Sequence, residues 1–313
     1  MADKKITWGI SIPQAFTDGV IDLGLVRECV IQAEEKGYDS LWVQEQLFGG
    51  APVLEAISLL GYVSAVTSRV KLGTSVMLPA FHDPIRLAKS LSSLDQISGG
   101  RLILGVGFGG WRDTYGSLNV PREGLARRFE ESLRVMESLW TEKDASFSGE
   151  FWKLEGQPMQ PKPVTRIPLW FGGRAPAALH RAVRMGDGWM GAGSSSSESF
   201  AEGAERVRQL LKDSGRDPAT FAIAKRVYLA VDDDKERAER RLVEWFGHFY
   251  GNGNLARKVA VWGSAEEVAS ELALLIKAGA QMLMLNPVLD LPFHIDTLWQ
   301  DVGPLAEAKA ASL

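Results

Sequence analysis

Three glycines at the end of one apolar run could bind a phosphate. Gly105, Gly107 and Gly110 satisfy the G-x-G-x-x-G spacing of dinucleotide-binding proteins. In such proteins a helix opens at once, because the amides at its N-terminus hold the pyrophosphate. Here the turn-rich stretch WRDTYGSLNVPREG follows, and a convincing helix begins only near Leu125. We therefore interpret the glycines as a broad loop that lets a flat ring approach the backbone, with plain tight turns as the alternative.

Few ionisable residues stand where they could act as acids or bases. Glu45 follows the apolar run 39–43 and could titrate, with a purely structural carboxylate as the alternative. His82 follows the run 70–76 and could donate a proton, with an ordinary turn histidine beside Asp83 as the alternative.

The composition of the chain argues against proteins that bind nucleic acid or membranes. The 313 residues are 45% hydrophobic and 24% charged, and the formal net charge of −4 comes without a conspicuous cluster of Lys or Arg. Binding of nucleic acid or of an anionic membrane therefore has no electrostatic support. No stretch approaches 18 uninterrupted apolar residues and the N-terminus has no apolar core, so we expect a cytoplasmic protein.

Neither cysteine nor histidine suggests a second kind of chemistry. Cys29 is the only cysteine and lies at helical spacing with Val26 and Ala33, so we expect a buried thiol rather than a nucleophile. The four histidines are far apart and show no metal-binding spacing. We therefore expect no metal ion.

Apolar runs and amphipathic helices alternate almost from end to end of the chain. Strands are predicted at residues 6–12, 39–43, 70–76, 101–107, 168–173, 187–191, 221–231 and 281–287. Such alternation is typical of a parallel sheet, and eight units indicate an α/β fold, a closed (β/α)8 TIM barrel. No long polar linker marks a boundary, so we expect one domain over residues 1–313.

Insertions are expected in the loops at the C-terminal face of the barrel. A Gly- and aromatic-rich loop is predicted at 107–125, a hairpin with a Pro-rich crossing at 145–165, and polar loops at 191–199 and 251–263. Loops at this face carry the specificity of TIM barrels, so the substrate is chosen there.

At 72–111 the segment LGTSVMLPAFHDPIRLAKSLSSLDQISGGRLILGVGFGGW resembles the signature of the bacterial luciferase-like monooxygenase superfamily. AEEKGYDSLWVQEQ at 33–46 and PLWFGGRAPAALHRAVRMGDGW at 168–189 support the resemblance, which runs nearly end to end. It implies a TIM barrel that binds FMN or the deazaflavin coenzyme F-420 at the strand ends. The Thr-Ser-Val end of the third strand and the phrase GGRAPAALHRA favour the deazaflavin branch, with FMN as the alternative cofactor.

The resemblance also implies which residues contact the cofactor. Those beside the ring would be Thr74, Ser75, Val76, Gly107, Phe108 and Gly109, with a cis peptide bond between Ser75 and Val76. Those holding the phosphate and tail would be Gly172, Gly173, Arg174, Ala192, Gly193 and Ser194. The phosphate assignment has independent support, since a strand ending in Gly-Gly and a helix with Pro176 in its first turn would bring amides and a guanidinium together. An ordinary βα turn is the alternative.

Two departures from the family pattern narrow the chemistry. Deazaflavin sugar-phosphate dehydrogenases resemble this chain, but they have an Asp-His pair where it has Glu45-Gln46, and a Glu where it has Gly110. Gln46 cannot act as a general base, so oxidation of a sugar phosphate is disfavoured. The residues expected to shape the substrate pocket are Trp8, Gln14, Gln46, Trp111, Arg112 and Tyr115.

Three functions fit the sequence. The first is hydride transfer between a deazaflavin and a small organic substrate. The second is an FMN-dependent, two-component monooxygenase that uses dioxygen and a separate cofactor reductase. The third is a barrel that binds a flavin or deazaflavin without catalysis. The resemblance also suggests a homodimer, and symmetric dimers are common.

Overall fold

The computed structural model describes residues 6–109 and 113–313, and each of the eight predicted strands is present within two residues of its predicted bounds. The barrel strands are β1 (Thr7–Ser11), β2 (Ser40–Val43), β3 (Lys71–Thr74), β4 (Leu102–Val106), β7 (Leu169–Gly172), β8 (Gly188–Gly191), β9 (Ala222–Val231) and β11 (Met282–Pro287). They pair in parallel in this order, and β11 pairs with β1, which closes the ring. The predicted (β/α)8 barrel is confirmed.

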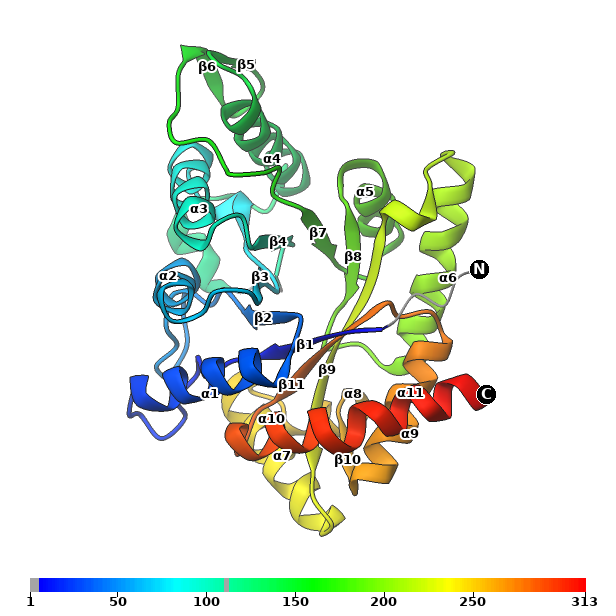
Figure 1. Cartoon of the computed structure of the whole chain (residues 1–313). Helices are drawn as coiled ribbons and strands as arrows, with labels where there is room; N and C mark the ends of the chain where they lie inside the picture. The colour runs from blue at the N-terminus through cyan, green and yellow to red at the C-terminus, as the bar shows by residue number, and fades with distance from the viewer. Residues whose placement is uncertain (1–5, 110–112) are drawn as a thin grey trace.

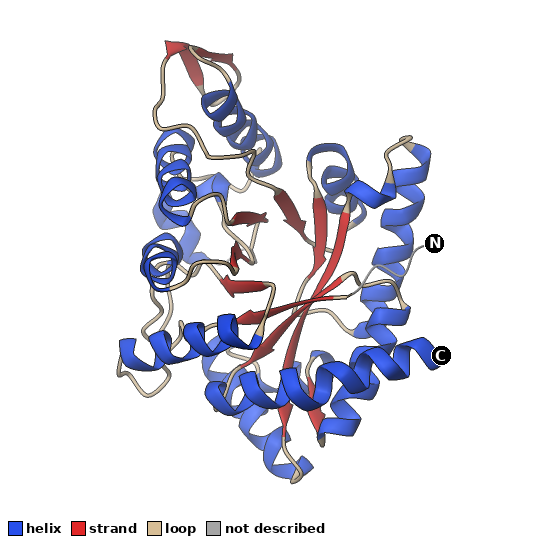
Figure 2. Cartoon of the chain, viewed as in Figure 1, coloured by secondary structure: helices blue, strands red, loops and turns tan. Residues whose placement is uncertain are grey.

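Helices surround the ring of strands on its outside (Figures 1 and 2). The helices are α1 (Leu23–Lys36), α2 (Ala56–Val66), α3 (Pro84–Ser98), α4 (Leu125–Thr141), α5 (Pro176–Met185), α6 (Ser197–Asp213), α7 (Lys235–Tyr250), α8 (Ala256–Val259), α9 (Ala265–Lys277), α10 (Leu291–Thr297) and α11 (Gly303–Ser312). Within residues 6–109 and 113–313 none of them is long and apolar enough to cross a membrane. In the same ranges no three His, Cys, Asp or Glu side chains gather as metal ligands would.

Local sequence signals set the ends of these helices. The Asp83 side chain accepts two hydrogen bonds of 3.0 Å from first-turn amides of α3, and Gly99 ends that helix with a left-handed φ of 71°. Ser264 and Glu267 form a capping box at the start of α9. In α1, Cys29 is fully buried, and burial raises the pKa of its thiol to about 12, so it is no nucleophile.

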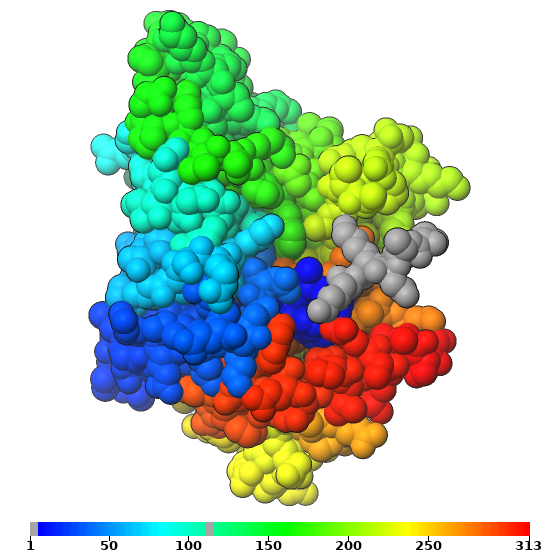
Figure 3. All heavy atoms as spheres, viewed as in Figure 1, coloured from blue at the N-terminus to red at the C-terminus, as the bar shows by residue number. Residues whose placement is uncertain are grey.

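Elements from near the two ends of the described chain lie side by side. β1 pairs with β11, and α1 packs against α10 on the outside of the barrel (Figure 3). The Tyr38 hydroxyl, which follows α1, donates a 3.0 Å hydrogen bond to the Ile295 carbonyl of α10. Closure of the barrel therefore joins residues from opposite ends of the described chain, such as Thr7 and Met282.

Two features lie outside the barrel repeat. The predicted hairpin is present as β5 (Ala145–Ser148) and β6 (Lys153–Gln157), and it projects beyond α4 at the top of Figure 1. A short strand, β10 (Val261–Gly263), pairs with the end of β9 in a stretch that we expected to be a polar loop. That expectation was wrong because a three-residue run is too short to stand out, whereas the ten-residue β9 extends past the barrel and offers it an edge.

A cluster of buried side chains from five strands packs inside the barrel. It consists of Trp42, Ile103, Met190, Ala224, Met282 and Met284. Trp42 is fully buried and lies directly against the neighbouring strand, because β3 has a glycine there. A Cβ added to Gly73 would lie 2.3 Å from Trp42 Cε3, which is shorter than any real carbon contact.

Gly73→Ala should therefore destabilise the barrel by about 1–3 kcal/mol, because the added methyl overpacks a core that cannot give way. Denaturant unfolding followed by circular dichroism measures the change. Gly61→Ala is the matched control, since a Cβ there meets nothing within 4 Å on a helix. It should stabilise the protein by about 0.5–1 kcal/mol. Equal effects of the two substitutions would contradict this account of Gly73.

Candidate active site

The third barrel strand leaves the sheet just after Thr74. Its backbone bulges at Ser75 and Val76, whose peptide bond is cis as expected, and it rejoins β4 at Met77. The Ser75 amide donates a 2.7 Å hydrogen bond to the Val43 carbonyl of β2, which fixes one side of the bulge. Val76 is the one residue of the bulge that is not buried. The bulge thus presents the Val76 side chain at the C-terminal mouth of the barrel.

Glycines of β4 and β7 allow the bulge to come close. A Cβ on Gly105 would lie 1.9 Å from the Thr74 carbonyl oxygen, and one on Gly107 would lie 2.9 Å from a methyl of Val76. From the other side, a Cβ on Gly172 would lie 3.0 Å from the second methyl of Val76. These glycines therefore serve a close approach of strands, as well as leaving the mouth open beside Val76.

Beyond the glycines the chain turns towards the outer helices. The Phe108 ring packs edge-on against Phe129 of α4, with centroids 4.7 Å apart, and the Arg181 guanidinium of α5 lies 5.0 Å from the Phe108 ring centre. The partly buried Phe108 ring is thereby fixed against the outer helices. Gly109 follows with a φ of 63°, and the next described element is the short helix η2 (Asp113–Leu118). No dinucleotide-type helix opens in the described part of this loop.

Glu45 and His82 come from different strand ends and meet. Glu45 Oε1 lies 2.5 Å from His82 Nε2, and Glu45 Oε2 accepts a 2.6 Å hydrogen bond from the Leu78 amide. The Glu45 side chain is 3% exposed and that of His82 is 26% exposed. Burial by itself would lower the pKa of His82, but the hydrogen bond and charge of Glu45, helped by Glu55, raise it above its ordinary value. The pair can hold and release a proton beside the bulge.

Arg226 of β9, which no sequence motif singled out, lies buried behind the bulge and is 8% exposed. Its guanidinium donates to four neutral oxygens, which are Asn286 Oδ1 (2.7 Å), the Ser75 carbonyl (2.9 Å), Gln44 Oε1 (2.8 Å) and the Tyr228 hydroxyl (2.7 Å). Arg226 thus joins the ends of β2, β9 and β11 to the bulge. The signal that could have revealed it is the Lys-Arg pair inside the apolar strand FAIAKRVYLAV.

Lys225 is also buried, on the opposite face of β9, and is 2% exposed. Its Nζ donates to the Ala192 carbonyl (2.6 Å), the Ser195 carbonyl (2.8 Å) and Ser195 Oγ (3.2 Å). Burial, followed by the charge of Arg226, lowers the pKa of Lys225 to about 7. Two cations whose hydrogen-bond acceptors are all neutral therefore lie next to each other at the mouth.

The residues predicted to hold a phosphate lie where β7 runs into α5. Gly173 has a φ of 129°, and Arg174 is exposed without a hydrogen bond or ion pair to any described residue. Pro176 is the first residue of α5, and Ala175 before it offers no side-chain cap to the amides. Pro176 has no N–H and the Ala178 amide already donates to the Ala175 carbonyl (2.8 Å), so the Ala177 amide and the Arg174 guanidinium are the donors here that could meet an anion. The turn after β8 holds the other predicted tail residues, which are Ala192, Gly193 and Ser194.

Trp8 was expected in the substrate pocket, and that prediction was wrong. Its indole Nε1 donates a 2.8 Å hydrogen bond to Glu307 of α11, and its ring lies against Gly303. Trp8 lines a hollow with Tyr38 and Trp299 near the start of β1, away from the strand ends. Side chains alternate between the two faces of a strand, and the contact with Glu307 shows that Trp8 is on the face towards the outer helices.

The other residues predicted to line the substrate pocket lie in different parts of the structure. Gln14 is 5% exposed, and its Nε2 donates to the carbonyls of Gln44 (2.6 Å) and Leu54 (2.8 Å), so it ties two mouth loops together. Gln46 is half-buried beyond the end of β2, and Tyr115 belongs to η2. The residues of this region that lie outside the described ranges are Gly110, Trp111 and Arg112.

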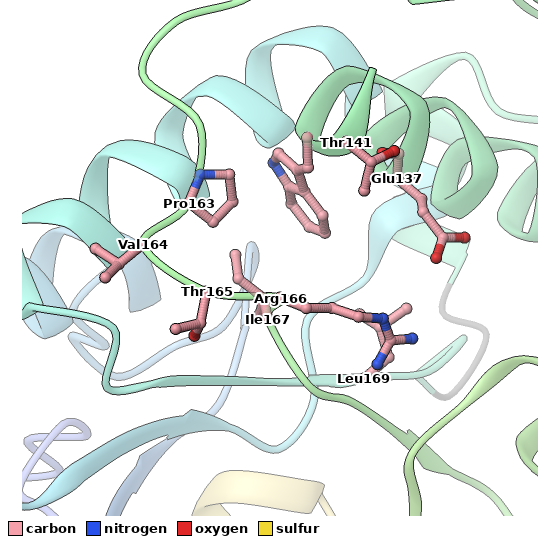
Figure 4. Close-up of a pocket in the computed structure, with 9 residues that line it drawn as sticks. Glu137, Thr141, Pro163, Val164, Thr165, Arg166, Ile167 and Leu169 are labelled. Carbon is pink, nitrogen blue, oxygen red and sulfur yellow. The ribbon is translucent and has the colours of Figure 1, made fainter. Parts of the chain in front are cut away.

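Two hollows differ in what lines them. One of 50 Å³ lies at the mouth between β1, β2, β9 and β11, and Gln14, Arg226 and Asn286 line it. A larger one of 230 Å³ lies between Trp140 of α4 and the segment that enters β7, including Arg166 and Leu169 (Figure 4). The larger hollow contains none of the predicted site residues. The mouth, where TIM barrels place their active sites, is therefore the candidate site.

Glu45→Gln should lower the pKa of His82, because burial then acts without the carboxylate that opposes it. A titration of the histidine Cε1 protons by NMR measures the change. Glu55→Gln is the control, since Glu55 acts on His82 through its charge without a hydrogen bond. The fall should be smaller in that variant. An unchanged His82 titration in Glu45→Gln would show that the pair does not form in solution.

The chain matches a described family over most of its length. The family described as luciferase-like monooxygenase covers residues 8–282. An F420-dependent glucose-6-phosphate dehydrogenase of Kineococcus radiotolerans is 30% identical over 233 residues, which are 71% of this chain and 68% of that protein. The resemblance drawn from the sequence is therefore confirmed.

Solved structures share the fold. An F420-dependent secondary alcohol dehydrogenase in complex with an F420–acetone adduct has a TM-score of 0.81 at 21% identity, over 96% of this chain and 99% of that chain. The oxygenating constituent of 3,6-diketocamphane monooxygenase from Pseudomonas putida, in complex with FMN, has a TM-score of 0.74 at 17% identity, over 96% and 98%. At these identities the likeness concerns the fold. The family match and the dehydrogenase relative establish that the chain belongs to the luciferase-like monooxygenase family.

Proposed function

We propose that the protein is an oxidoreductase that passes a hydride between coenzyme F-420, a deazaflavin, and a small organic substrate. The observation that carries the proposal is the bulge at Val76, flanked by Gly107 and Gly172. A flat ring can lie against such a surface because the flanking residues have no side chains to block it. The dehydrogenase relative and the alcohol dehydrogenase neighbour, both F420-dependent, support a deazaflavin.

The residues present fit a cofactor with a ring and an anionic tail. Val76 would back the ring, and the backbone of Gly107 to Gly109 would lie beside it. The Ala177 amide of α5, together with Gly173 and Arg174, would hold the phosphate. The turn of Ala192 to Ser194 would line the tail. When bound, the deazaflavin supplies the hydride donor or acceptor.

The Glu45–His82 pair would manage the proton that accompanies the hydride. Reduction of a carbonyl leaves an oxygen that must be protonated, and oxidation of an alcohol releases that proton. His82 keeps its proton to higher pH than an ordinary histidine because Glu45 stabilises the charged form. The partly exposed His82 ring would therefore act as the acid, and Glu45 would orient it.

The substrate would differ from that of the glucose-6-phosphate dehydrogenase relative. Gln46 and Gly110 stand where sugar-phosphate dehydrogenases of this kind have a His and a Glu. Direct proton transfer at those two positions is therefore lost. A small neutral alcohol or ketone is a better match to a mouth with one acid–base pair.

An FMN-dependent monooxygenase is the second candidate, favoured by the FMN-bound structural neighbour. It would use the same bulge and phosphate residues, together with dioxygen and a separate flavin reductase. For either function we also propose a cytoplasmic homodimer, as the family resemblance suggests.

Titration of the purified protein with coenzyme F-420 and with FMN distinguishes the two cofactors. We expect the fluorescence of coenzyme F-420 to respond with a dissociation constant at least tenfold lower than that for FMN. Steady-state reduction of F-420 by a panel of alcohols then tests catalysis. Tight binding of FMN with no response to F-420 would replace the first candidate by the second.

Arg174→Ala should weaken binding of the preferred cofactor about tenfold, because a guanidinium–phosphate contact is lost. Calorimetric titration measures the change. Arg166→Ala removes the same charge near the start of β7, where Arg166 pairs with Asp187 at 2.6 Å, and should leave affinity unchanged. If the unaltered protein and both variants bind the cofactor equally well, the phosphate does not bind at the start of α5.

A further inference from the structure

The turn between β8 and α6 is held from both faces of β9. On one face, Lys225 Nζ spans the turn from the Ala192 carbonyl to the Ser195 carbonyl and hydroxyl, at 2.6, 2.8 and 3.2 Å. On the other face, Gly193 packs so closely that an added Cβ would lie 2.7 Å from Tyr228 Cε2. The path of the turn is therefore set by β9 side chains.

A positive charge is an unusual way to hold a turn. Each of the three Nζ donors of Lys225 meets a neutral oxygen, and no described carboxylate pairs with it. A buried ammonium without an anionic partner costs stability, and an apolar side chain of the same length would avoid that cost. The neighbouring cation, Arg226, adds to the cost. A purely structural role does not account for the charge.

We propose that Lys225 is a positioning residue, which holds the turn at 192–195 in the conformation that receives an anionic cofactor tail and supplies the positive charge behind it. The proposal rests on the proposed function, because it assumes that a phosphate-bearing cofactor occupies the mouth. Lys225 itself touches the turn and not the cofactor. An incoming anion would be the negatively charged partner that the Lys225 ammonium lacks in the free protein.

The first test is Lys225→Met, which keeps the length of the side chain and removes its charge. Calorimetric titration with coenzyme F-420, and with FMN, should show affinity about tenfold weaker than that of the unaltered protein. The midpoint of thermal unfolding should stay the same or rise, because a buried charge has been removed. Lys212→Met at the exposed end of α6 removes the same charge and should change neither quantity.

The pH dependence provides a readout that a structural contact would not move. Lys225 has a pKa of about 7 in the free protein, and an anion beside it favours the charged form and raises that pKa. Affinity is therefore greatest below pH 7 and falls as pH rises through the pKa of the complex. The ratio of the Lys225→Met and unaltered dissociation constants should fall from about tenfold at pH 6 towards one at pH 9.

Other charged groups around Lys225 are few. β9 brings Arg226 and the first turn of α6 brings the exposed Glu198, whereas β8 and β11 bring no ionisable side chain. Because the comparison is a ratio, the ionisation of the cofactor itself cancels. The remaining pH dependence then belongs to Lys225.

The outcomes separate the two proposals. If the unaltered protein binds neither F-420 nor FMN, the proposed function fails. If it binds one of them and Lys225→Met binds it equally well, or with a ratio that does not change with pH, the role of Lys225 is overturned. Should Lys225→Met not fold, Ser195→Ala removes one acceptor of Nζ and should weaken binding about threefold. Unchanged affinity in Ser195→Ala would then count against the proposal.

Discussion

The mouth of this barrel depends on how closely the end of β3 approaches β4. The Thr74 carbonyl oxygen occupies the space that a side chain at Gly105 would need, since a Cβ there would lie 1.9 Å away. This close approach of Thr74 to Gly105 sets the position of the bulge at Ser75 and Val76. The Glu45 amide then donates to the Val76 carbonyl (3.3 Å), and Arg226 donates to the Ser75 carbonyl (2.9 Å). Glu45 and Arg226 are thereby both hydrogen-bonded to the backbone of the bulge.

Two adjacent cations on β9 connect the bulge with the turn after β8 on the opposite side of the mouth. Arg226 faces inward to the bulge, and Lys225 faces outward to the turn after β8. Neither is neutralised by a carboxylate within hydrogen-bond distance among the described residues. A protein accepts such a cost where a negatively charged ligand repays it. The electrostatics of the mouth therefore agree with an anionic cofactor, independently of the family match.

The fold was predictable because its signals are local. Each barrel strand is a short apolar run, and residues such as Asp83 and Gly99 mark helix ends in the sequence itself. The site was predictable only in part. Trp8 was misplaced because the strand period does not say which face looks into the barrel. Arg226 was missed because its four partners are scattered along the chain and meet only when the ring of strands closes.

The Glu45–His82 pair is assembled from residues that follow two different strands. The position after Glu45 holds Gln46 and so lacks the histidine expected from sugar-phosphate dehydrogenases. The imidazole comes instead from the end of β3, where the η1 helix (Pro79–Phe81) delivers His82 to the same carboxylate. The amide of Leu78, which precedes η1, also donates to Glu45. The Glu45 carboxylate therefore fixes the segment that carries His82. A carboxylate–imidazole pair at the mouth is thus built from two neighbouring strand ends, and a motif read along one strand cannot reveal it.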